Sequence, residues 1–520
     1  MSEVIMRKSI MSAVFTLTLF TVLDRALGFG FKIYLSRELG ATSLGLYQVA
    51  LSFFFVLLTA TTSGIPLVVS KMTARYRLTG EIKREGSLTA AALVVGGVIA
   101  IGICATILLL YKPLGSVILN GESALVLLFL LPALLFSSVY SALRGNLWGR
   151  QRYVSVSVVE IIEQIARIIA CVILFTVGAN KLLSTAASLS AGCLVSMVCV
   201  IGCFVNAKGK LFSPKGEIVP LLKTSTPITV SRAASSIVNS VIAVAVPFLL
   251  TSSGYDANEA MAIYGAGIGM ALPLLYIPIT VVGSLSFVMI PTVSEGVIKK
   301  DFSRVNSQIE SAIGFAIIIS TLFVPAFFVL GERIGAFVYD DASAGVFLSR
   351  AAWLLVPLAV ENITSSVMNS LDLEIRSFFN YLIGSAVMFA FCFAFYGAFD
   401  ITIMSAGLGI GWTVTSLLHI RSIRKRTGLG RRHIIKLAGA AAIAIPTVFV
   451  TKCIYSLCSG LPTAVALIIP AVVSAVFFAA LCFAFSLVDI DFFSSRVKAS
   501  KIKTKNKCPK GRKRLHSDAV

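Results

Sequence analysis

The chain has 520 residues, of which 57% are hydrophobic and 13% are charged, and its formal net charge is +21. Soluble proteins average about 25% charged residues and their single cores stop growing at roughly 250–300 residues, so this composition excludes an ordinary soluble enzyme. Such a basic balance could indicate nucleic-acid binding, but the basic residues lie in short segments between apolar runs about 20 residues long, the length that crosses a membrane. We therefore expect a membrane protein with no nucleic-acid partner.

Apolar runs bounded by charge, proline and glycine predict an all-α polytopic membrane protein with about fourteen transmembrane helices. Runs this long must be helices, because lipid cannot satisfy the backbone of an open strand. In chain order the expected spans are 10–35, 44–69, 88–111, 123–143, 153–177, 183–204, 225–250, 260–290, 312–330, 347–369, 379–397, 401–419, 434–457 and 463–488.

The connections between these spans indicate the orientation. Basic residues fill every second connection, whereas the alternate set has only Arg37, Lys112, Lys181 and Arg333. Positive residues stay on the cytoplasmic side, so both termini are expected there and the number of spans is even. The first run is too long and too charged for a cleaved signal peptide, and we expect it to be the first helix.

Weak internal symmetry predicts the domain organisation. The segments LGLYQ at 44–48 and MAIYG at 261–265 each open the second span of a six-span unit. Two six-helix lobes followed by two further helices would result. The expected domains are an N-lobe at 1–210, a C-lobe at 211–430, two C-terminal helices at 431–488 and a basic cytoplasmic tail at 489–520.

The fifth span carries the clearest polar signal. Glu160, Glu163 and Arg167 follow one another at spacings of three and four, which places them on one helix face. The order of Glu163 and Arg167 favours an ion pair in which the carboxylate orients the guanidinium. One alternative is that this pair only neutralises itself; the other is that it opens and closes during transport.

Further charges lie in the first, seventh and tenth spans. Arg25 and Lys32 are seven residues apart and share a face, although Lys32 could also reach the interface as an ordinary snorkelling residue. Since a charge near the bilayer centre costs about 2.5–3.5 kcal/mol, we interpret the whole set as lining a hydrated cavity that suits an anionic substrate. The expected substrate-binding residues are Arg25, Lys32, Arg167 and Arg232, and the expected cavity acids with a gating role are Asp24, Glu160, Glu163 and Glu361.

Glycine and proline inside the spans predict hinges. Span two ends with Gly64 and Pro66, and span eight contains Pro273 and Pro278. Such residues bend membrane helices where neighbours or water satisfy the freed backbone, and ordinary kinking is the alternative. The chain has no phosphate-binding loop, no HExxH, and cysteines without CxxC spacing, so we expect no enzyme activity, no catalytic residue, no metal site and no cofactor. The driving force, a coupling ion or the membrane potential, stays open.

Four stretches together resemble one known group. DRALGFGFKIYLSRELGATSLGLYQ (24–48), SGIPLVVSK (63–71), VEIIEQIARII (159–169) and the segment 262–295 are similar to the stage V sporulation protein B group of polysaccharide flippases. That group belongs to the multidrug/oligosaccharidyl-lipid/polysaccharide exporter superfamily. In related lipid II flippases, arginines around an R-x-L-G-F motif are needed for function; Arg25 matches this motif, and Lys32 falls one residue beyond the second basic position. Span eight lacks the basic residue of those relatives, which Arg232 could replace.

The resemblance implies an alternating-access flippase in the bacterial cell membrane. Its implied substrate is a polyprenyl-pyrophosphate-linked glycan, in particular a peptidoglycan precursor for the spore cortex. Membrane lipids and cell-wall synthesis enzymes are the implied partners. Two alternatives remain: a cation-coupled multidrug or metabolite antiporter that uses Glu361 or Glu163, and a non-transporting scaffold that recruits enzymes through its basic tail.

Overall fold

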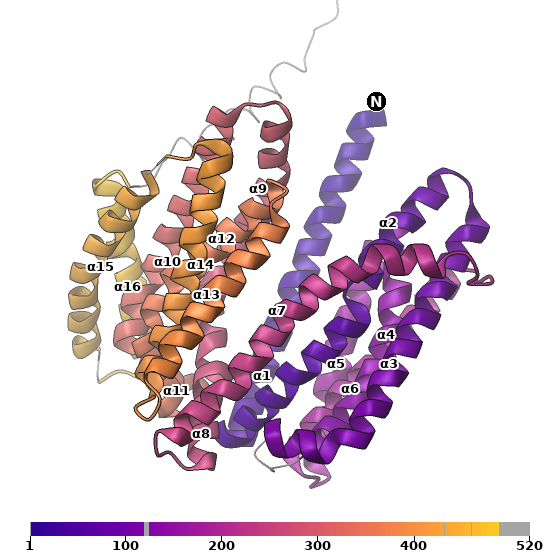
Figure 1. The fold of residues 1–520 in the computed structure, drawn as a ribbon. Coiled ribbons are helices and arrows are strands. Elements are labelled where there is room, and N and C mark those ends of the chain that lie inside the picture. Colours follow the sequence, from indigo (N-terminus) through magenta and orange to yellow (C-terminus); the bar gives the residue numbers. More distant parts are fainter. Residues whose placement is uncertain (1, 119–123, 431, 459, 488–520) are drawn as a thin grey trace, which may run out of the picture. The chain divides into compact units, whose positions relative to one another are not determined.

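The computed structural model describes residues 2–118, 124–430, 432–458 and 460–487, and these residues form helices and no strand. The basic tail at 489–520 therefore lies outside the described residues. Figure 1 shows the helices in chain order. Their bounds are α1 Ser2–Thr62, α2 Ile65–Leu78, α3 Ile82–Ile118, α4 Leu125–Gly149, α5 Tyr153–Thr176, α6 Lys181–Asn206, α7 Ile218–Ser252, α8 Ala257–Tyr264, η1 Gly265–Ala271, α9 Leu272–Ile298, α10 Phe302–Tyr339, α11 Ala342–Ala351, η2 Ala352–Leu354, α12 Leu355–Ser370, α13 Glu374–Ala394, α14 Ile401–Thr427, α15 Arg432–Leu457 and α16 Thr463–Ala484.

The helices confirm a polytopic all-α membrane protein. Twelve helical stretches among the described residues are long and apolar enough to cross a membrane. The first of these runs over 57 residues, far more than the roughly 20 that one crossing needs. Helix α5 is not among the twelve, since Glu160, Glu163 and Arg167 lie within its 24 residues. Dividing the first stretch in two and adding α5 gives about fourteen crossings in the described part of the chain.

The first apolar stretch divides at Gly40. Its φ of +70° and ψ of 173° are not helical, so α1 is two helices that meet at a kink. Residues with a Cβ rarely adopt a positive φ, and glycine supplies it without steric cost. The kink divides α1 into two helices, each of which is long enough for one crossing.

The predicted hinge residues lie at breaks in helix geometry. Helix α1 ends at Thr62, Gly64 precedes α2, and Pro66 lies in the first turn of α2, where its missing N–H costs nothing. Pro273 and Pro278 lie in α9 directly after η1, which is a seven-residue π-helix. Segments of π-helix widen the backbone spacing and often mark functional sites. Whether these breaks move stays a prediction.

Several helices extend beyond the apolar runs from which they were predicted. The expected connection at 70–87 is wrong for most of its length, because α2 continues to Leu78 and α3 begins at Ile82. Likewise α4 includes Arg144 and ends only at Gly149. An apolar run ends where the lipid ends, whereas a helix continues as long as its backbone hydrogen bonds are favourable.

The chain forms two compact units. The first contains residues 1–277, 330–354 and 375–415, and the second contains 278–329, 355–374 and 416–520. These units do not coincide with the lobes expected at 1–210 and 211–430, and the lobe assignment stays a prediction.

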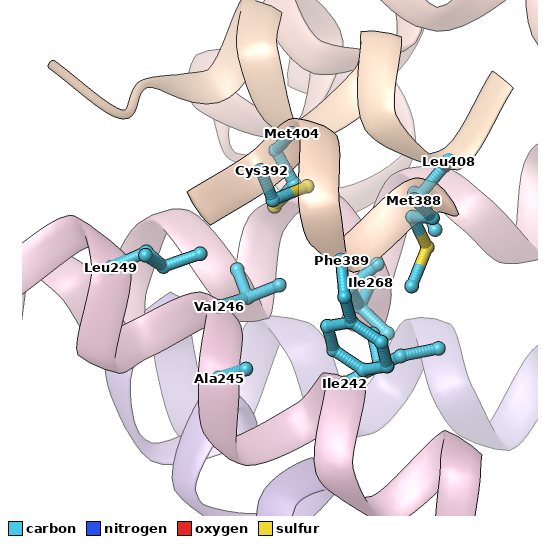
Figure 2. A pocket seen from close by; sticks show the side chains of 10 residues that line it. All are labelled: Ile242, Ala245, Val246, Leu249, Ile268, Met388, Phe389, Cys392, Met404 and Leu408. Atoms are coloured by element: carbon cyan, nitrogen blue, oxygen red, sulfur yellow. The ribbon is translucent and has the colours of Figure 1, made fainter. Parts of the chain in front are cut away.

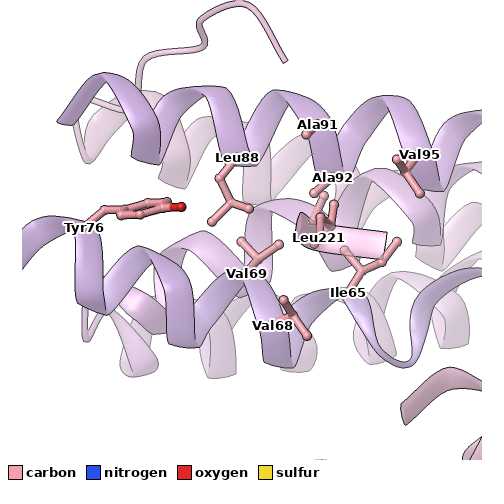
Figure 3. Close-up of a cluster of buried hydrophobic side chains, with 10 residues drawn as sticks. Ile65, Val68, Val69, Tyr76, Leu88, Ala91, Ala92, Val95 and Leu221 are labelled. Carbon is pink, nitrogen blue, oxygen red and sulfur yellow. The ribbon is translucent and has the colours of Figure 1, made fainter. Parts of the chain in front are cut away.

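A buried apolar cluster holds the start of the first unit together (Figure 3). Helices α2 and α3 contribute most of it, and α7 enters it through Leu221, which is fully buried. Burial of such side chains stabilises a fold by roughly 1.5–3 kcal/mol each in water. The members are Ile65, Val68, Val69, Tyr76, Leu88, Ala91, Ala92, Val95, Ala142 and Leu221.

The first unit also contains a very close helix crossing. A Cβ built on Gly45 of α1 would lie 2.1 Å from the Met261 carbonyl oxygen, and one built on Gly265 would lie 2.0 Å from the Ala41 carbonyl oxygen. Only glycine permits this approach of two backbones. The segments 44–48 and 261–265, whose similarity suggested an internal repeat, thus pack directly against each other.

The second unit is joined by polar contacts between its helices. Asn306 Nδ2 of α10 donates to the Thr427 carbonyl at 2.8 Å, and the Ser294 hydroxyl of α9 donates to the Ser370 carbonyl of α12 at 3.1 Å. Helices α15 and α16 pack against each other at its end. Interhelical hydrogen bonds of this kind add specificity where lipid offers no competing partner.

Candidate functional site

Helices α1 and α5 lie side by side and present their charged faces to each other. A Cβ built on Gly28 would lie 3.7 Å from Gln164 Nε2, and the rings of Tyr34 and Phe175 stack at 6.0 Å. Positions in both helices increase together, so the helices run in the same direction. Two membrane helices that run in the same direction are separated along the chain by an odd number of crossings. Dividing α1 at Gly40 gives an odd number of crossings between its first part and α5, which supports the division.

The acidic part of this face precedes its cationic part in both helices. Asp24 and Glu160 are close enough for their charges to interact. Glu160 is paired with Arg144 of α4, whose Nη2 lies 3.3 Å from Glu160 Oε1. The Arg144 guanidinium also stacks over the Trp148 ring at 4.1 Å. Arg144 follows the expected span 123–143, so its pairing with Glu160 was not predicted.

The cationic part of the face follows two helical turns further along. Arg167 Nη2 donates a hydrogen bond of 2.9 Å to the hydroxyl of Tyr47, and its Cζ lies 5.1 Å from the centre of the Phe31 ring. Lys32 follows Phe31 and is close enough to Arg167 for the two charges to repel. The Tyr47 side chain is 2% exposed. Tyr47 is a partner that the sequence did not reveal, because it lies in the apolar segment LGLYQ.

The expected ion pair between Glu163 and Arg167 is absent. Among the described residues no such contact lies within ion-pair distance, and the guanidinium turns to Tyr47 instead. Glu163 turns toward α6, where Cys193 Sγ donates to its Oε1 at 3.8 Å. Helix spacing allows a pair at i and i+4, but the neighbouring helices decide which partner each side chain meets.

The remaining predicted cations of the first unit are exposed. Arg25 lies on α1 between the acidic and cationic parts, and its side chain makes no ion pair within the described residues. Arg232 of α7 donates to the Ser63 carbonyl oxygen at 3.3 Å, beside the break at Gly64. Gly64 itself packs closely, since a Cβ there would lie 2.5 Å from the Ser225 carbonyl oxygen. Arg232 is thus tied to the break between α1 and α2.

Glu361 belongs to the second unit. It lies on α12 and is partly buried, and its carboxylate has no hydrogen bond or ion pair with any described residue. One turn away, the Thr364 hydroxyl contacts His419 Nδ1 of α14 at 3.2 Å.

Two charged networks lie at the helix ends of the first unit, and sequence analysis missed both. In one, Arg150 Nε lies 2.6 Å from Glu85 Oε1, and Glu85 is 1% exposed. In the other, Glu217 at the start of α7 accepts from Arg84 at 2.9 Å and from the Tyr76 hydroxyl at 2.8 Å. Arg84 and Arg150 lie in expected connections, where they were taken only as basic residues that set the orientation. Their contacts with the buried carboxylates of Glu217 and Glu85 join helix ends to one another.

An apolar pocket lies elsewhere in the same unit, among α7, η1, α13 and α14 (Figure 2). Its lining contains no nitrogen or oxygen in any side chain, so it has nothing with which to orient a charged group. The lining residues are Ile242, Ala245, Val246, Leu249, Ile268, Met388, Phe389, Cys392, Met404 and Leu408. The polar face of α1 and α5 is therefore the candidate site in the first unit.

Within the described residues, no group of three or more histidine, cysteine, aspartate or glutamate side chains could hold a metal ion. The nine described cysteines are free thiols, most of them buried in helices. The geometry thus offers charged groups for binding and orientation. Cys193 contacts the site through its hydrogen bond to Glu163.

Solved structures with the same fold are membrane transporters. A structure of lipid II flippase MurJ in an inward closed conformation has a TM-score of 0.72 and 14% identity, covering 91% of this chain and 99% of that one. An inward-facing multidrug resistance MATE family transporter of the MOP superfamily has a TM-score of 0.67 and 17% identity, covering 80% and 98%. These similarities establish the fold of a multi-pass membrane protein.

Proteins with similar sequences narrow the choice of protein family. The chain is 26% identical over 422 residues to stage V sporulation protein B of Bacillus subtilis (strain 168), covering 78% of this chain and 81% of that protein. It is 29% identical over 177 residues to lipid II flippase MurJ of the same organism, covering 32% of each. The model of a family described as polysaccharide biosynthesis protein matches residues 10–297, more than half of the chain. The chain belongs to the polysaccharide biosynthesis protein family.

Proposed function

We propose that this protein is an alternating-access flippase that moves a lipid-linked anionic glycan across the bacterial cell membrane. The observation that carries this proposal is the charged face between α1 and α5, on which Arg167 and Lys32 are close enough for their charges to interact. Charges at this depth are costly and are retained where they contact a substrate or water. A flippase for which an anionic head group is the cargo needs such a face.

The charged head group of the substrate is what makes transport across the membrane difficult. A sugar carrying phosphate cannot cross bare hydrocarbon, because removing its charges from water costs far more than thermal energy supplies. Side chains that replace water around the head group remove this barrier, while the lipid tail stays in the bilayer. Arg25, Lys32, Arg167 and Arg232 are the proposed substrate contacts, and Asp24, Glu160 and Glu163 are proposed to act as gating acids.

The proposed substrate is a polyprenyl-pyrophosphate-linked glycan, in particular a peptidoglycan precursor used for the spore cortex. The names of two similar proteins, lipid II flippase MurJ and stage V sporulation protein B, support a lipid-linked substrate and a role in sporulation. Both termini are proposed to be cytoplasmic. Membrane lipids and cell-wall synthesis enzymes are the proposed partners, and no cofactor is part of the proposal beyond a coupling ion or the membrane potential.

A transport assay tests this function. The intact protein is reconstituted into liposomes that contain a lipid-linked peptidoglycan precursor labelled on its head group, and a membrane-impermeant quencher reports which leaflet holds the label. Movement that is lost with Arg25→Ala and kept with Glu361→Gln supports the flippase. A lack of movement with the intact protein contradicts it.

Glu361 favours a second candidate, a cation-coupled antiporter. A partly buried carboxylate without a partner among the described residues is a place where a proton or sodium ion can bind during transport. This candidate predicts that the intact protein moves a labelled organic cation and that Glu361→Gln stops the movement, while Arg25→Ala leaves it unchanged. The same liposomes distinguish the two candidates.

A further inference from the structure

The middle of α7 carries a stripe of polar side chains that lies apart from the charged face of α1 and α5. Arg232, Ser236 and Asn239 are three or four residues apart, so they lie on one face of the helix. The large apolar side chains that α7 exposes lie about 180° from Asn239 around the helix axis, and they are Val230, Ile237, Val241 and Phe248. Since the exposed apolar face of a membrane helix contacts lipid, the polar stripe points away from lipid.

Helix α13 has the same arrangement. Tyr381 lies on the side of the helix opposite to its exposed apolar side chains, which include Ile375, Phe379 and Ile383. The Tyr381 hydroxyl donates to Asn239 Oδ1 at 3.0 Å. Both residues belong to the first unit. The polar sides of α7 and α13 therefore meet at this hydrogen bond.

Helix α1 adds further polar groups to the stripe. Thr59 Oγ1 lies 3.0 Å from Ser236 Oγ, and Arg232 donates to the Ser63 carbonyl oxygen. Ser236 and Asn239 lie near the middle of α7, at a depth where lipid offers no hydrogen-bond partner. Asn239 is nevertheless exposed, on the side that faces away from lipid. An exposed amide at this depth requires water or a ligand as its partner.

The Asn239 amide has hydrogen-bonding capacity left for a ligand. Its Oδ1 accepts from Tyr381, whereas its Nδ2 donates to no described residue. An amide nitrogen supplies two donors, and the hydroxyls of Thr59 and Ser236 can each donate and accept. None of these three side chains carries a charge. They suit a ligand that has several hydroxyl or amide groups and no charge of its own, which is the chemistry of a sugar ring.

The apolar pocket lies further along the same two helices (Figure 2). Ile242 and Val246, one and two turns beyond Asn239, line it from α7, and Met388 lines it from α13. Because this lining offers no side-chain hydrogen bond, it cannot hold a sugar ring. The hydrogen-bonding groups are at the level of Asn239.

We propose that Thr59, Ser236 and Asn239 form a subsite for one sugar ring of a lipid-linked glycan. Tyr381 is the positioning residue, because its hydroxyl fixes the direction of the Asn239 amide. This inference rests on the proposed function and deepens it, since it assigns a contact to the neutral part of the substrate. A site that hydrogen-bonds hydroxyl groups discriminates against a ligand that lacks them, because its own polar groups are then left unpaired. The subsite thus gives a preference for lipids that carry a glycan.

Binding measurements on the intact protein test the subsite without a transport step. Farnesyl diphosphate that carries N-acetylglucosamine, and farnesyl diphosphate alone, are each titrated into the purified protein in a detergent without a sugar head group. The ratio of the two dissociation constants is the sugar-dependent gain in affinity. We expect a gain of about tenfold or more, since each neutral hydrogen bond contributes about fivefold.

Substitutions in the subsite should reduce this gain and leave the affinity for farnesyl diphosphate unchanged. Asn239→Leu and Ser236→Ala each remove hydrogen-bonding groups, and we expect the gain to fall about fivefold in each variant. Tyr381→Phe keeps the Asn239 amide but removes its positioning hydroxyl, so the gain should fall severalfold. Tyr396→Phe changes a tyrosine beyond the end of α13 and is the matched control, with an unchanged gain.

Three results would overturn the subsite. The first is an equal affinity of the intact protein for the two farnesyl ligands. The second is a set of variants in which both ligands are weakened equally, because the polar contacts would then only hold helices together. The third is binding of free N-acetylglucosamine as tightly as the lipid-linked sugar, which would end the lipid-linked assignment.

The subsite and the proposed function can fail separately. A gain that depends on Asn239, in a protein that moves no precursor in liposomes, would support the subsite and refute the proposed function. Movement of the precursor by a protein with no sugar-dependent gain would support the function and refute the subsite.

Discussion

The glycine crossing between α1 and the segment that begins at α8 gives the sharpest prediction of stability. A Cβ added at Gly265 would lie 2.0 Å from the Ala41 carbonyl oxygen and 2.8 Å from the Gly45 nitrogen. Real Cβ atoms essentially never approach a heavy atom within 3.0 Å, and both neighbours here are backbone atoms that cannot rotate away. The two helices must therefore separate by about 1 Å or more, and overpacking of this kind costs about 1–3 kcal/mol.

We expect Gly265→Ala to lower the free energy of unfolding by about 1–3 kcal/mol, as measured by titration of the detergent-solubilised protein with SDS. Gly30→Ala is the matched control, because a Cβ at Gly30 of α1 meets nothing within 4 Å. The control should change stability by less than about 1 kcal/mol, in the stabilising direction, since alanine favours helix over glycine. An unchanged unfolding free energy for Gly265→Ala would refute the close crossing.

The charged helix ends yield three further predictions, all measured by the same unfolding titration. Glu85→Gln leaves Arg150 buried without its carboxylate partner, and we expect a loss of about 3–5 kcal/mol; a loss below 1 kcal/mol would mean that the pair is exposed in solution. Tyr76→Phe removes the hydroxyl donor to Glu217 and should cost about 1.5–3 kcal/mol, with no change if water replaces that hydroxyl. Hydrogen bonds from Thr79 and Arg84 lower the pKa of Glu81, so its stabilising contribution is present above the unfolded pKa and is lost as the pH falls through the folded one. Glu81→Gln should therefore flatten the acid side of the stability profile, and an unchanged profile would argue against those bonds.

The membrane-spanning pattern was predictable because lipid imposes it. Each crossing needs a long apolar run and a continuous helix, and both can be recognised from residue types alone. The helix ends were not predictable to the same degree. Helices α2 and α4 continue into polar residues, where hydropathy falls but the backbone remains helical. For this reason Arg144 was placed in a connection although it lies in α4.

The candidate site was only partly predictable. The spacing of Glu160, Glu163 and Arg167 correctly placed three charges within one helix, because helix periodicity is a local property. Their partners were not predictable, since Tyr47, Arg144 and Cys193 come from other helices. A tyrosine within an apolar segment gives no sign in the sequence that it will hold a guanidinium. Tertiary packing decides such contacts.

The similarity between residues 44–48 and 261–265 also shows that sequence patterns do not predict tertiary contacts. Sequence comparison within the chain indicated two related segments and suggested two repeated lobes. The structure adds that the segments touch, with Gly45 against Met261 and Gly265 against Ala41. Small residues at matched positions are what a close crossing requires. Whether two segments touch depends on the three-dimensional structure, and the similarity of their sequences does not reveal it.

The most direct test of the flippase proposal is the initial rate at which the reconstituted protein moves a labelled lipid-linked peptidoglycan precursor between leaflets, compared with a neutral lipid that carries the same prenyl chain. We predict rapid movement of the anionic precursor, none of the neutral lipid, and loss of movement with Lys32→Gln but not with the matched change Lys112→Gln in α3. Equal movement of both lipids, or no movement of the precursor by the intact protein, would contradict transport of a lipid-linked anion through the charged face of α1 and α5.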